Sequence, residues 1–429
     1  MRRSQQEDYL KSVTRALAMV VVLVMGGAST TSWAQSGFEA EPVLKAKDLV
    51  APELLKGPNF TVDERVPVVG FLARFTVRSD FGTFDVHGIH MLQVRIPEIY
   101  ALAQLDKMSK TREFADAAAK AAARPVASAA HMIVNPVETV EGLPGGVSRL
   151  FDRIKLGGES IAAAATASGQ SGEQKAADVS QRVGSITVDA FGFEKERRDL
   201  AKSLGVDPYT SNPVLSKKLT DMAWVAFSGR FGIQAAMSVF VPGSSVLSVV
   251  TITNSTVYDT PPGDLIKAAQ AIFAQTGASD AQVQALLKNP QYTLSVLTAL
   301  ALGIQRLQGV NGLPSVIDFA AAAKTQDETR LVAAAVNVLA RHHEGTQRVA
   351  QVTAPGPIIA RTVTGALLVP APVDYIAWTQ RTARLAQRDD LKASQRTAWL
   401  SGQMSPRARK QFEGQGWTVF ESFTIAAER

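Results

Sequence analysis

The sequence predicts an α+β protein that is predominantly α-helical, a helical array with a minor antiparallel β component. Apolar residues recur at helical spacing through residues 263–344. Apolar and polar residues alternate between Val66 and Gly88, as they do in a half-buried β-strand. β-Branched segments near 348–369 and 417–424 indicate further strands. Together these observations define the fold class.

Composition divides the chain into five parts. Residues 1–34 have the pattern of a signal peptide, and residues 35–63 form a polar, proline-containing extended lead-in. Residues 64–156 hold a β-hairpin and helices. Residues 157–184 are small, polar and nearly free of large apolar side chains, as in a flexible linker. Residues 185–429 complete the chain as an α-rich domain with short strands.

The N-terminus predicts export. An apolar run from Ala16 to Gly27 follows a basic region, and small residues at Ser32 and Ala34 precede a cleavage site between Ala34 and Gln35. The run is too short to cross a bilayer comfortably, since that takes roughly 20 residues. We therefore expect a protein that is periplasmic or envelope-associated after cleavage, with an uncleaved N-terminal anchor as the alternative.

Composition also excludes several classes of chemistry. The 429 residues include no cysteine, which removes a disulfide framework, cysteine-ligated zinc and a thiol nucleophile. The formal net charge of +6 is ordinary for this length, and the 46% of apolar residues permits a buried core without disulfides. Export argues against nucleic acid as a partner. No pattern in the sequence indicates a cofactor or a bound metal.

The alternating stretch from Val66 to Gly88 predicts a β-hairpin, because SDFG at Ser79–Gly82 supplies turn residues between its two halves. The following text, MLQVRIPEI, predicts a third strand that ends where Pro97 opens a helix. Apolar spacing and an Ala-rich run predict that this helix extends over residues 97–132.

The second half begins with two stretches of helical spacing, Phe193–Leu204 and Leu215–Phe227. Between them lies the turn-rich insert DPYTSNP, at Asp207–Pro213. The uncharged stretch Phe231–Ile252 is long enough to span a membrane, but Pro242-Gly243 interrupts it. The interruption favours two buried core elements over a transmembrane helix.

Residues 263–344 predict four or five short helices with tight connections and no fixed sequence repeat. Ser279 with Gln282 has the spacing of a capping box, and Thr325 with Glu328 offers a second start signal of this kind. After residue 345, two β-branched segments predict paired strands. Residues 375 to about 412 then predict helix, and WTVFESFTI predicts a last strand.

The glycine-rich stretch NPVETVEGLPGGVSRLFDRIK, residues 135–155, lacks the lysine and the spacing of a phosphate-binding loop. Four apolar residues after the glycines share one face of a short amphipathic helix. We expect this face to pack on the protein itself, with membrane contact and anion binding at the helix start as alternatives. The face consists of Val147, Leu150, Phe151 and Ile154.

Histidines give no catalytic or metal-binding signature. No HExxH or GxSxG motif is present. His87 and His90 flank the end of the predicted hairpin, where only unusual turn geometry brings two imidazoles together. His342 and His343 fall at a predicted helix C-terminus, where capping of the last carbonyls is the simplest role.

Carboxylates near the hairpin are candidates for acid–base work, but no spacing selects a pair. These carboxylates are Asp85, Glu98, Asp106 and Glu113. The insert Asp207–Pro213 is rich in polar groups on a constrained loop, which suits ligand binding. Turns and helix ends use the same residue types without any ligand, so the structural role is the simpler interpretation.

Basic residues predominate between Arg381 and Lys410, where they far outnumber acidic ones. Most of those at the start of this segment recur near one face of a predicted helix, which favours binding to anionic lipid headgroups or acidic cell-wall polymers. A solvated face with local ion pairs is the plainer alternative. The candidate residues are Arg381, Arg384, Arg388, Lys392 and Arg396.

These observations favour an exported, non-catalytic cell-envelope protein that acts in the periplasm as an interaction or scaffold component with a protein partner. One alternative is a binding module for anionic lipid or cell-wall polymer. Another is a hydrolase whose site is assembled from distant residues. A pocket that holds two carboxylates, or His87 with a carboxylate, favours the hydrolase. The oligomeric state stays open.

Overall fold

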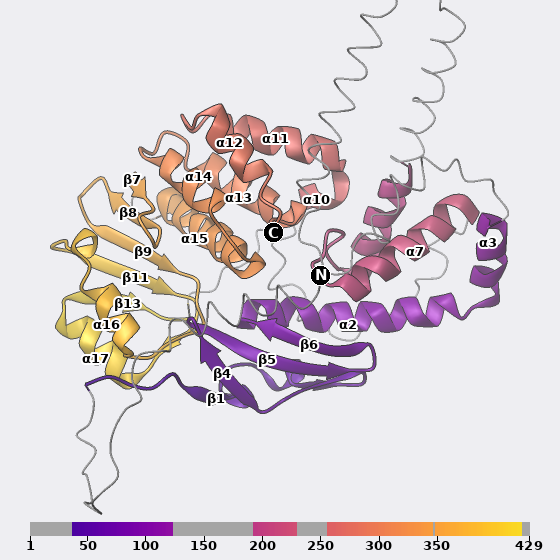
Figure 1. The fold of residues 1–429 in the computed structure, drawn as a ribbon, viewed down its shortest axis with the longest axis horizontal. Helices are drawn as coiled ribbons and strands as arrows, with labels where there is room; N and C mark the ends of the chain where they lie inside the picture. The colour runs from indigo at the N-terminus through magenta and orange to yellow at the C-terminus, as the bar shows by residue number, and fades with distance from the viewer. Residues whose placement is uncertain (1–36, 123–191, 230–254, 346–347, 423–429) are drawn as a thin grey trace, which may run out of the picture. The chain divides into compact units, whose positions relative to one another are not determined.

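The computed structural model describes residues 37–122, 192–229, 255–345 and 348–422 (Figure 1). The chain forms two compact units, Met1–Phe38 and Glu39–Arg429, and the second contains every helix and strand discussed below. Helices combine with an antiparallel sheet and a mixed sheet, so the fold is broadly α+β.

Several sequence-based predictions lie outside the described residues. They concern the signal peptide, the linker of residues 157–184 and the uncharged stretch Phe231–Ile252. The predicted amphipathic face lies outside as well, and it comprises Val147, Leu150, Phe151 and Ile154. Among the helices that are described, none combines the length and the apolar character needed to cross a bilayer.

The N-terminal sheet is antiparallel and is built around β5 (Leu72–Ser79). β6 (Gly82–His87) pairs with β5, with Val86 opposite Phe75, so the predicted hairpin is confirmed. Four further strands complete the sheet in the order β1-β4-β5-β3-β2. The four are β1 (Val43–Lys45), β2 (Lys56–Gly57), β3 (Phe60–Val62) and β4 (Arg65–Val69). The first three come from the stretch expected to be an extended lead-in.

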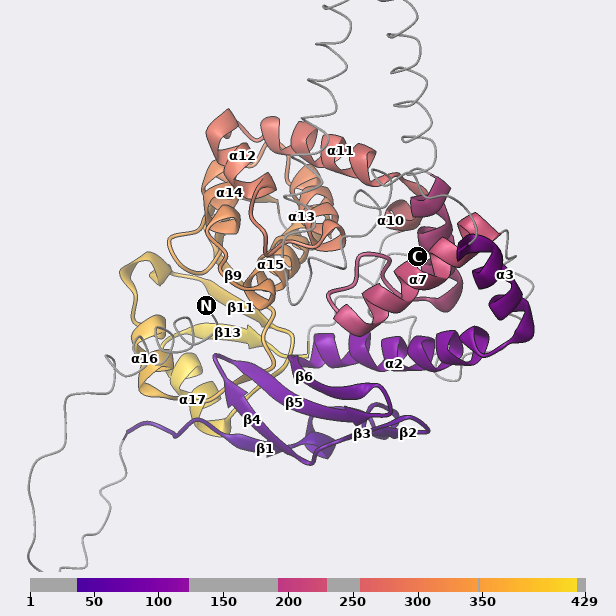
Figure 2. The same cartoon turned by 45° about the vertical axis from the view of Figure 1, so that its right-hand side comes forward.

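The predicted third strand, MLQVRIPEI, is wrong. The chain enters α2 (Ile89–Ser109) directly after β6, and Pro97 lies inside this helix. Leu92, Ile96 and Ile99 are fully or almost fully buried in the core beside the sheet. Burial of three such side chains, at about 1.5–3 kcal/mol each, outweighs the cost of an interior proline, about 3 kcal/mol. Figures 1 and 2 show α2 lying along β5 and β6.

Two helices flank the Asp207–Pro213 insert as predicted. Residues 192–204 are helical, and α7 (Pro213–Gly229) begins at the end of the insert. Both pack on the C-terminal half of α2, where Leu102 and Leu105 share a core with Leu200 and Leu215. α3 (Arg112–Ala122) follows α2 and contacts α7.

The predicted run of short helices is confirmed for residues 262–345. The capping box of Ser279 and Gln282 is present, and Oγ1 of Thr325 accepts a hydrogen bond from the Glu328 amide at 3.2 Å. One continuous apolar core joins these helices. After α10 (Ser255–Asp259) they are α11 (Pro262–Ala274), α12 (Asp280–Leu287), α13 (Leu294–Arg306), α14 (Leu313–Ala321) and α15 (Gln326–Gly345).

The C-terminal sheet has five strands in the order β13-β11-β9-β8-β7. β8 is antiparallel to β7 and β9, whereas β11 is parallel to both β9 and β13, so the sheet is mixed. The strands predicted near 348–369 and 417–424 are therefore present. The five are β7 (Val349–Thr353), β8 (Ile359–Thr362), β9 (Leu367–Ala371), β11 (Arg396–Leu400) and β13 (Trp417–Phe420).

The single helix predicted over residues 375–412 is wrong. The stretch contains two short helices, and β11 lies between them. Parallel strands need a crossover connection, and α16 (Gln380–Ala386) and α17 (Pro406–Gly414) lie in the two crossovers. The short strands β10 (Tyr375–Ile376) and β12 (Gln403–Met404) also pair in parallel. A strand of five residues contains too few alternating positions for its period-2 pattern to be recognised between two helical segments.

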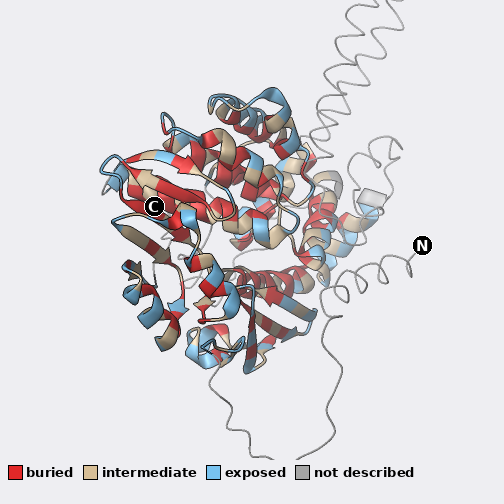
Figure 3. Ribbon diagram, turned by 60° about the vertical axis from the view of Figure 1, so that its left-hand side comes forward, coloured by how far each residue is buried: buried red, intermediate tan, exposed pale blue. Residues whose placement is uncertain are grey.

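Asp374 joins the C-terminal part to the N-terminal sheet. Its carboxylate accepts hydrogen bonds from the backbone amides of Ala73 at 2.8 Å and Ile89 at 3.1 Å. Glu39 makes a second connection. Its backbone amide donates to the Trp378 carbonyl at 2.8 Å, and its carboxylate accepts from the Trp378 amide and from Oγ of Ser405, both at 2.5 Å. Figure 3 shows buried residues, in red, on the strands and on the inward faces of the helices.

Candidate functional site

A pocket of about 270 Å³ lies where four segments meet: the end of β6, the first turns of α2, the Asp207–Pro213 insert and the first turn of α15. Val86 and Met91 contribute apolar surface, and the rest of the lining is polar or charged. The residues that matter most for its chemistry are Asp85, His87, Arg95, Ser211, Asp327 and Arg330.

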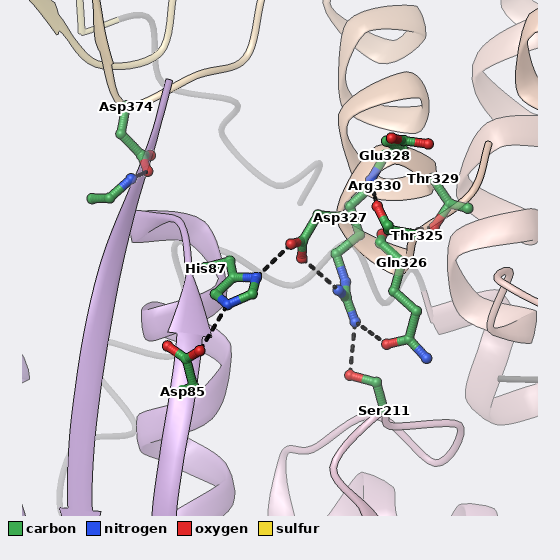
Figure 4. Close-up of polar contacts among 11 residues, drawn as sticks. Asp85, His87, Ser211, Thr325, Gln326, Asp327, Glu328, Thr329, Arg330 and Asp374 are labelled. Carbon is green, nitrogen blue, oxygen red and sulfur yellow. Dashed lines mark hydrogen bonds and ion pairs between the residues drawn. The ribbon is translucent and has the colours of Figure 1, made fainter. Parts of the chain in front are cut away.

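His87 is the last residue of β6, and the alternation of the strand places Asp85 on the same face. Nδ1 of His87 lies 2.6 Å from Oδ2 of Asp327, and Nε2 lies 3.1 Å from Oδ2 of Asp85 (Figure 4). The Asp85 side chain is 73% exposed, whereas those of His87 and Asp327 are 28% and 24% exposed. The contact at Nδ1 is therefore short and largely shielded from solvent, whereas the contact at Nε2 is longer and involves an exposed carboxylate.

Asp327 is placed by the start of α15. Thr325 caps this helix, and a carboxylate in the first turn is stabilised by the exposed backbone amides and the helix dipole. One turn along, Arg330 places Nη1 3.6 Å from Oδ1 of Asp327. The two oxygens of one carboxylate thus face two different cations, His87 and Arg330 (Figure 4).

Arg330 also connects α15 to the insert. Its Nη2 donates to Oγ of Ser211 at 2.7 Å and to Oε1 of Gln326 at 3.3 Å. The insert has the turns that its residue types predict, since Asp207 accepts from the Tyr209 amide and Asn212 accepts from the Val214 amide. The loop is therefore a structural turn that also presents Ser211 to the pocket.

A buried polar layer lies behind the pocket. The Glu98 carboxylate is 2% exposed and accepts hydrogen bonds from Arg95, from Thr210 and, at 3.1 Å, from Asn212. Asp207 accepts from Oγ of Ser295 at 2.5 Å, and burial raises the pKa of Asp207 to about 6. This layer fixes the insert against α2 and α13.

Electrostatics favour a charged His87. The hydrogen bond that His87 donates to Asp327 raises the pKa of His87, burial opposes the shift, and the bond to Asp85 adds to it. Burial disfavours the charged form of Asp327, but its bond to His87 and the charges of His87, Arg330 and Arg74 together lower the Asp327 pKa. By contrast, burial and the charge of Arg330 lower the pKa of His90 to about 4. Near pH 6, therefore, His87 of the HGIH segment favours the charged form and His90 the neutral form.

The structure brings some of the candidate carboxylates together and separates others. Asp85 lines the pocket and Glu98 lies behind it. Asp106 pairs with Lys110 at 2.7 Å and with Lys218 at 3.4 Å, on a different surface. Across the described parts of the chain, no group of three or more histidine, aspartate or glutamate side chains is placed to hold a metal ion.

His342 and His343 do lie in the last turn of a helix, α15, but their contacts are not those of a simple cap. His342 is buried with its ring centroid 4.3 Å from that of Trp399. Nδ1 of His343 accepts a hydrogen bond from the Val349 amide at 3.1 Å, so it tethers the following strand rather than a helix carbonyl.

The basic residues of 381–396 do not share one helical face, which corrects the sequence-based prediction. α16 ends at Ala386, so only Arg381 and Arg384 belong to it. Arg388 pairs with Asp390 at 2.7 Å and Lys392 with Asp389 at 2.6 Å. Arg396 lies in β11 with its guanidinium 5.3 Å from the centre of the Trp417 ring. Binding to an anionic surface stays a prediction.

Sequence patterns did not single out four of the pocket residues that matter for its chemistry: Arg95, Ser211, Asp327 and Arg330. Arg95 lies in the stretch that was expected to be a strand. Thr325 and Glu328 marked the start of the helix that carries Asp327 and Arg330, and the insert marked the loop that carries Ser211. Nothing in the local spacing links either segment to His87, which lies 240 residues before Asp327.

Comparison with known proteins adds no assignment. The chain matches no family model, no curated protein and no solved structure.

Proposed function

We propose that the His87 pocket is a general acid–base site and that the protein is an enzyme of the hydrolase class, with a site assembled from distant segments. One observation carries the proposal: Asp327 holds Nδ1 of His87 at 2.6 Å while Nε2 faces the exposed Asp85 in the pocket. A carboxylate on one ring nitrogen fixes the orientation and tautomer of an imidazole, and leaves the other nitrogen to transfer protons.

The surroundings support proton transfer in both directions. His87 is a proton donor below its raised pKa and a base above it. The Asp85 side chain is 73% exposed, so solvent can replace its contact with Nε2 when a substrate or a water molecule binds there. Arg330 and Arg95, which line the pocket, favour negative charge that develops in a transition state.

Water is the attacking group that this arrangement favours. Ser211 is the nearby hydroxyl, but it accepts a hydrogen bond from Arg330 rather than donating to His87. A serine used as a nucleophile needs an adjacent base. In the proposed step the neutral form of His87, present above its pKa, removes a proton from water as the water oxygen bonds to the electrophilic atom of the substrate. The protonated imidazole then gives that proton to the leaving group as the bond between the leaving group and that atom breaks, while the Arg330 side of the pocket stabilises the substrate oxygen that becomes negative.

The cellular location of this activity is also a proposal, and it rests on the sequence. The N-terminal pattern predicts export to the periplasm, with cleavage between Ala34 and Gln35. The hypothesis of a non-catalytic envelope scaffold, which the sequence favoured, stays a prediction that the pocket does not address.

The test is a screen of the purified protein against chromogenic esters, amides, phosphoesters and glycosides. Any activity found is measured again in His87→Gln and Asp327→Asn, and we expect both variants to lose about 10²–10⁴-fold in rate. Asp389→Asn, on a side chain that is 92% exposed, is the matched control and should keep the activity. Activity that survives in His87→Gln would contradict the proposal.

A further inference from the structure

Two largely buried guanidinium groups line the His87 pocket. Arg95 is 9% exposed, and the Arg330 side chain is 15% exposed. Burial lowers the pKa of Arg330, Asp327 opposes that shift, and the charge of Arg95 adds to it. Both guanidinium groups line the one pocket, so an anion bound there lies near two positive charges.

Both guanidinium groups have donor capacity left. Within the described residues, Nε of Arg95 is buried with no hydrogen-bond partner. Arg330 uses Nη2 for Ser211 and Gln326, while its Nη1 lies 3.6 Å from Asp327, beyond hydrogen-bond distance. Arginine binds carboxylate and phosphate through just such pairs of N–H groups.

A third guanidinium adds to the local charge. Arg74 pairs with His87 across the β5–β6 hairpin, and its charge acts on both His87 and Asp327. Its Nε is also buried without a partner among the described residues. The Asp85 carboxylate, which also lines the pocket, is 73% exposed and therefore screened by solvent. Arg95 is paired with the buried Glu98, whereas Arg330 lies 3.6 Å from Asp327, so Arg330 is the cation with the weaker ionic partner.

We propose that the His87 pocket binds an oxyanion, a carboxylate or phosphate group, through Arg330, with Arg95 supplying further positive charge. His87 and Arg330 contact the two oxygens of the same carboxylate, Asp327. A ligand anchored at Arg330 therefore lies in the same pocket as His87. The inference rests on the proposed function only in calling that ligand a substrate, because binding does not depend on turnover.

The test measures binding of two probes, inorganic phosphate and acetate, to the whole protein by isotope-labelled NMR at low ionic strength. We expect shifts at His87 that saturate for at least one probe, and the probe that binds more tightly identifies the group as phosphate or carboxylate. Arg330→Gln should weaken binding roughly 10- to 100-fold, which corresponds to the loss of one charge-assisted hydrogen bond. Arg65→Gln, on the exposed face of β4, is the matched control and should bind as the wild type does.

Folding of each variant is checked by its thermal unfolding, and Arg330→Lys replaces Arg330→Gln if the latter does not fold. Lysine keeps the charge but loses the planar pair of donors, so weaker binding is expected again. Absence of saturable shifts with both probes, or equal binding by the wild type and the Arg330 variant, would overturn the inference. The acid–base function would still stand if the activity of the His87 site were present, so the two failures are distinguishable.

Discussion

Nδ1 of His87 lies 2.6 Å from Oδ2 of Asp327, although the two residues are 240 positions apart in the chain. His87 ends a strand of the N-terminal sheet, and Asp327 begins the last helix of the array. The contact therefore forms only when β6 and α15 are packed in the folded protein. It also joins two elements whose separation would open the pocket.

The His87–Asp327 pair should stabilise the fold within a limited pH range. The raised pKa of His87 gives stability that is present below its unfolded value of 6.5 and is lost as pH rises through the folded value. The lowered pKa of Asp327 gives stability that is present above 3.8 and is lost as pH falls through the folded value. Asp327→Asn should therefore lower the free energy of unfolding more at pH 5–6 than at pH 9, as measured by urea denaturation. Equal losses at both pH values would count against the pair.

His90 should have the opposite effect on stability. Its pKa is lowered to about 4, so the unfolded chain takes up a proton near pH 6.5 that the folded chain refuses. The free energy of unfolding then falls as pH decreases from about 6.5 to about 4. His90→Asn removes this titration, and its stability should change less over that range than that of the wild type. A variant with the same pH slope as the wild type would show that His90 is free to ionise.

Glu98 should be essential to the buried layer behind the pocket. Its carboxylate accepts from Arg95, Thr210 and Asn212, so Glu98→Gln leaves a buried guanidinium without its anion. Removal of one partner of a buried ion pair costs about 3–5 kcal/mol. Glu113→Gln, at an exposed position on α3, is the matched control and should change stability by less than about 0.5 kcal/mol. Similar stability of the two variants in denaturant would contradict the role given to Glu98.

Asp374 should couple the C-terminal part to the placement of His87. It accepts from the amides of Ala73 and Ile89, and Ile89 begins α2 two residues after His87. Asp374→Asn points an amide group at one of these donors, and an unsatisfied buried donor costs about 1–3 kcal/mol. We expect that loss of stability together with shifted NMR signals of His87. Unchanged His87 signals would limit Asp374 to a purely structural role.

The sequence predicted the elements that are local and regular. Alternation around Phe75 and Val86 identified the hairpin, and capping signals at Ser279 and Thr325 located helix starts. It failed where tertiary packing decides the outcome. Burial of Ile96 and Ile99 continues α2 through Pro97, and β11 exists because it pairs in parallel with β9 and β13.

The sequence indicated some residues of the candidate site but not their partners. His87 and Asp85 were visible as polar residues at the end of a strand, and the insert was visible as a polar loop. Their partners were not, because Asp327 and Arg330 lie on a helix whose first turn looks like any charged helix start. The pocket forms only when distant segments meet in the tertiary fold, and local periodicity does not predict which segments meet.

The titration of His87 tests the central claim most directly, and it requires no substrate. The five histidines of the chain allow their Cε1–H signals to be assigned by single substitutions and followed by NMR against pH. We predict a pKa for His87 above 6.5 in the wild type, a clear fall in Asp327→Asn and a smaller fall in Asp85→Asn. A His87 pKa at or below 6.5 that Asp327→Asn leaves unchanged would contradict the account.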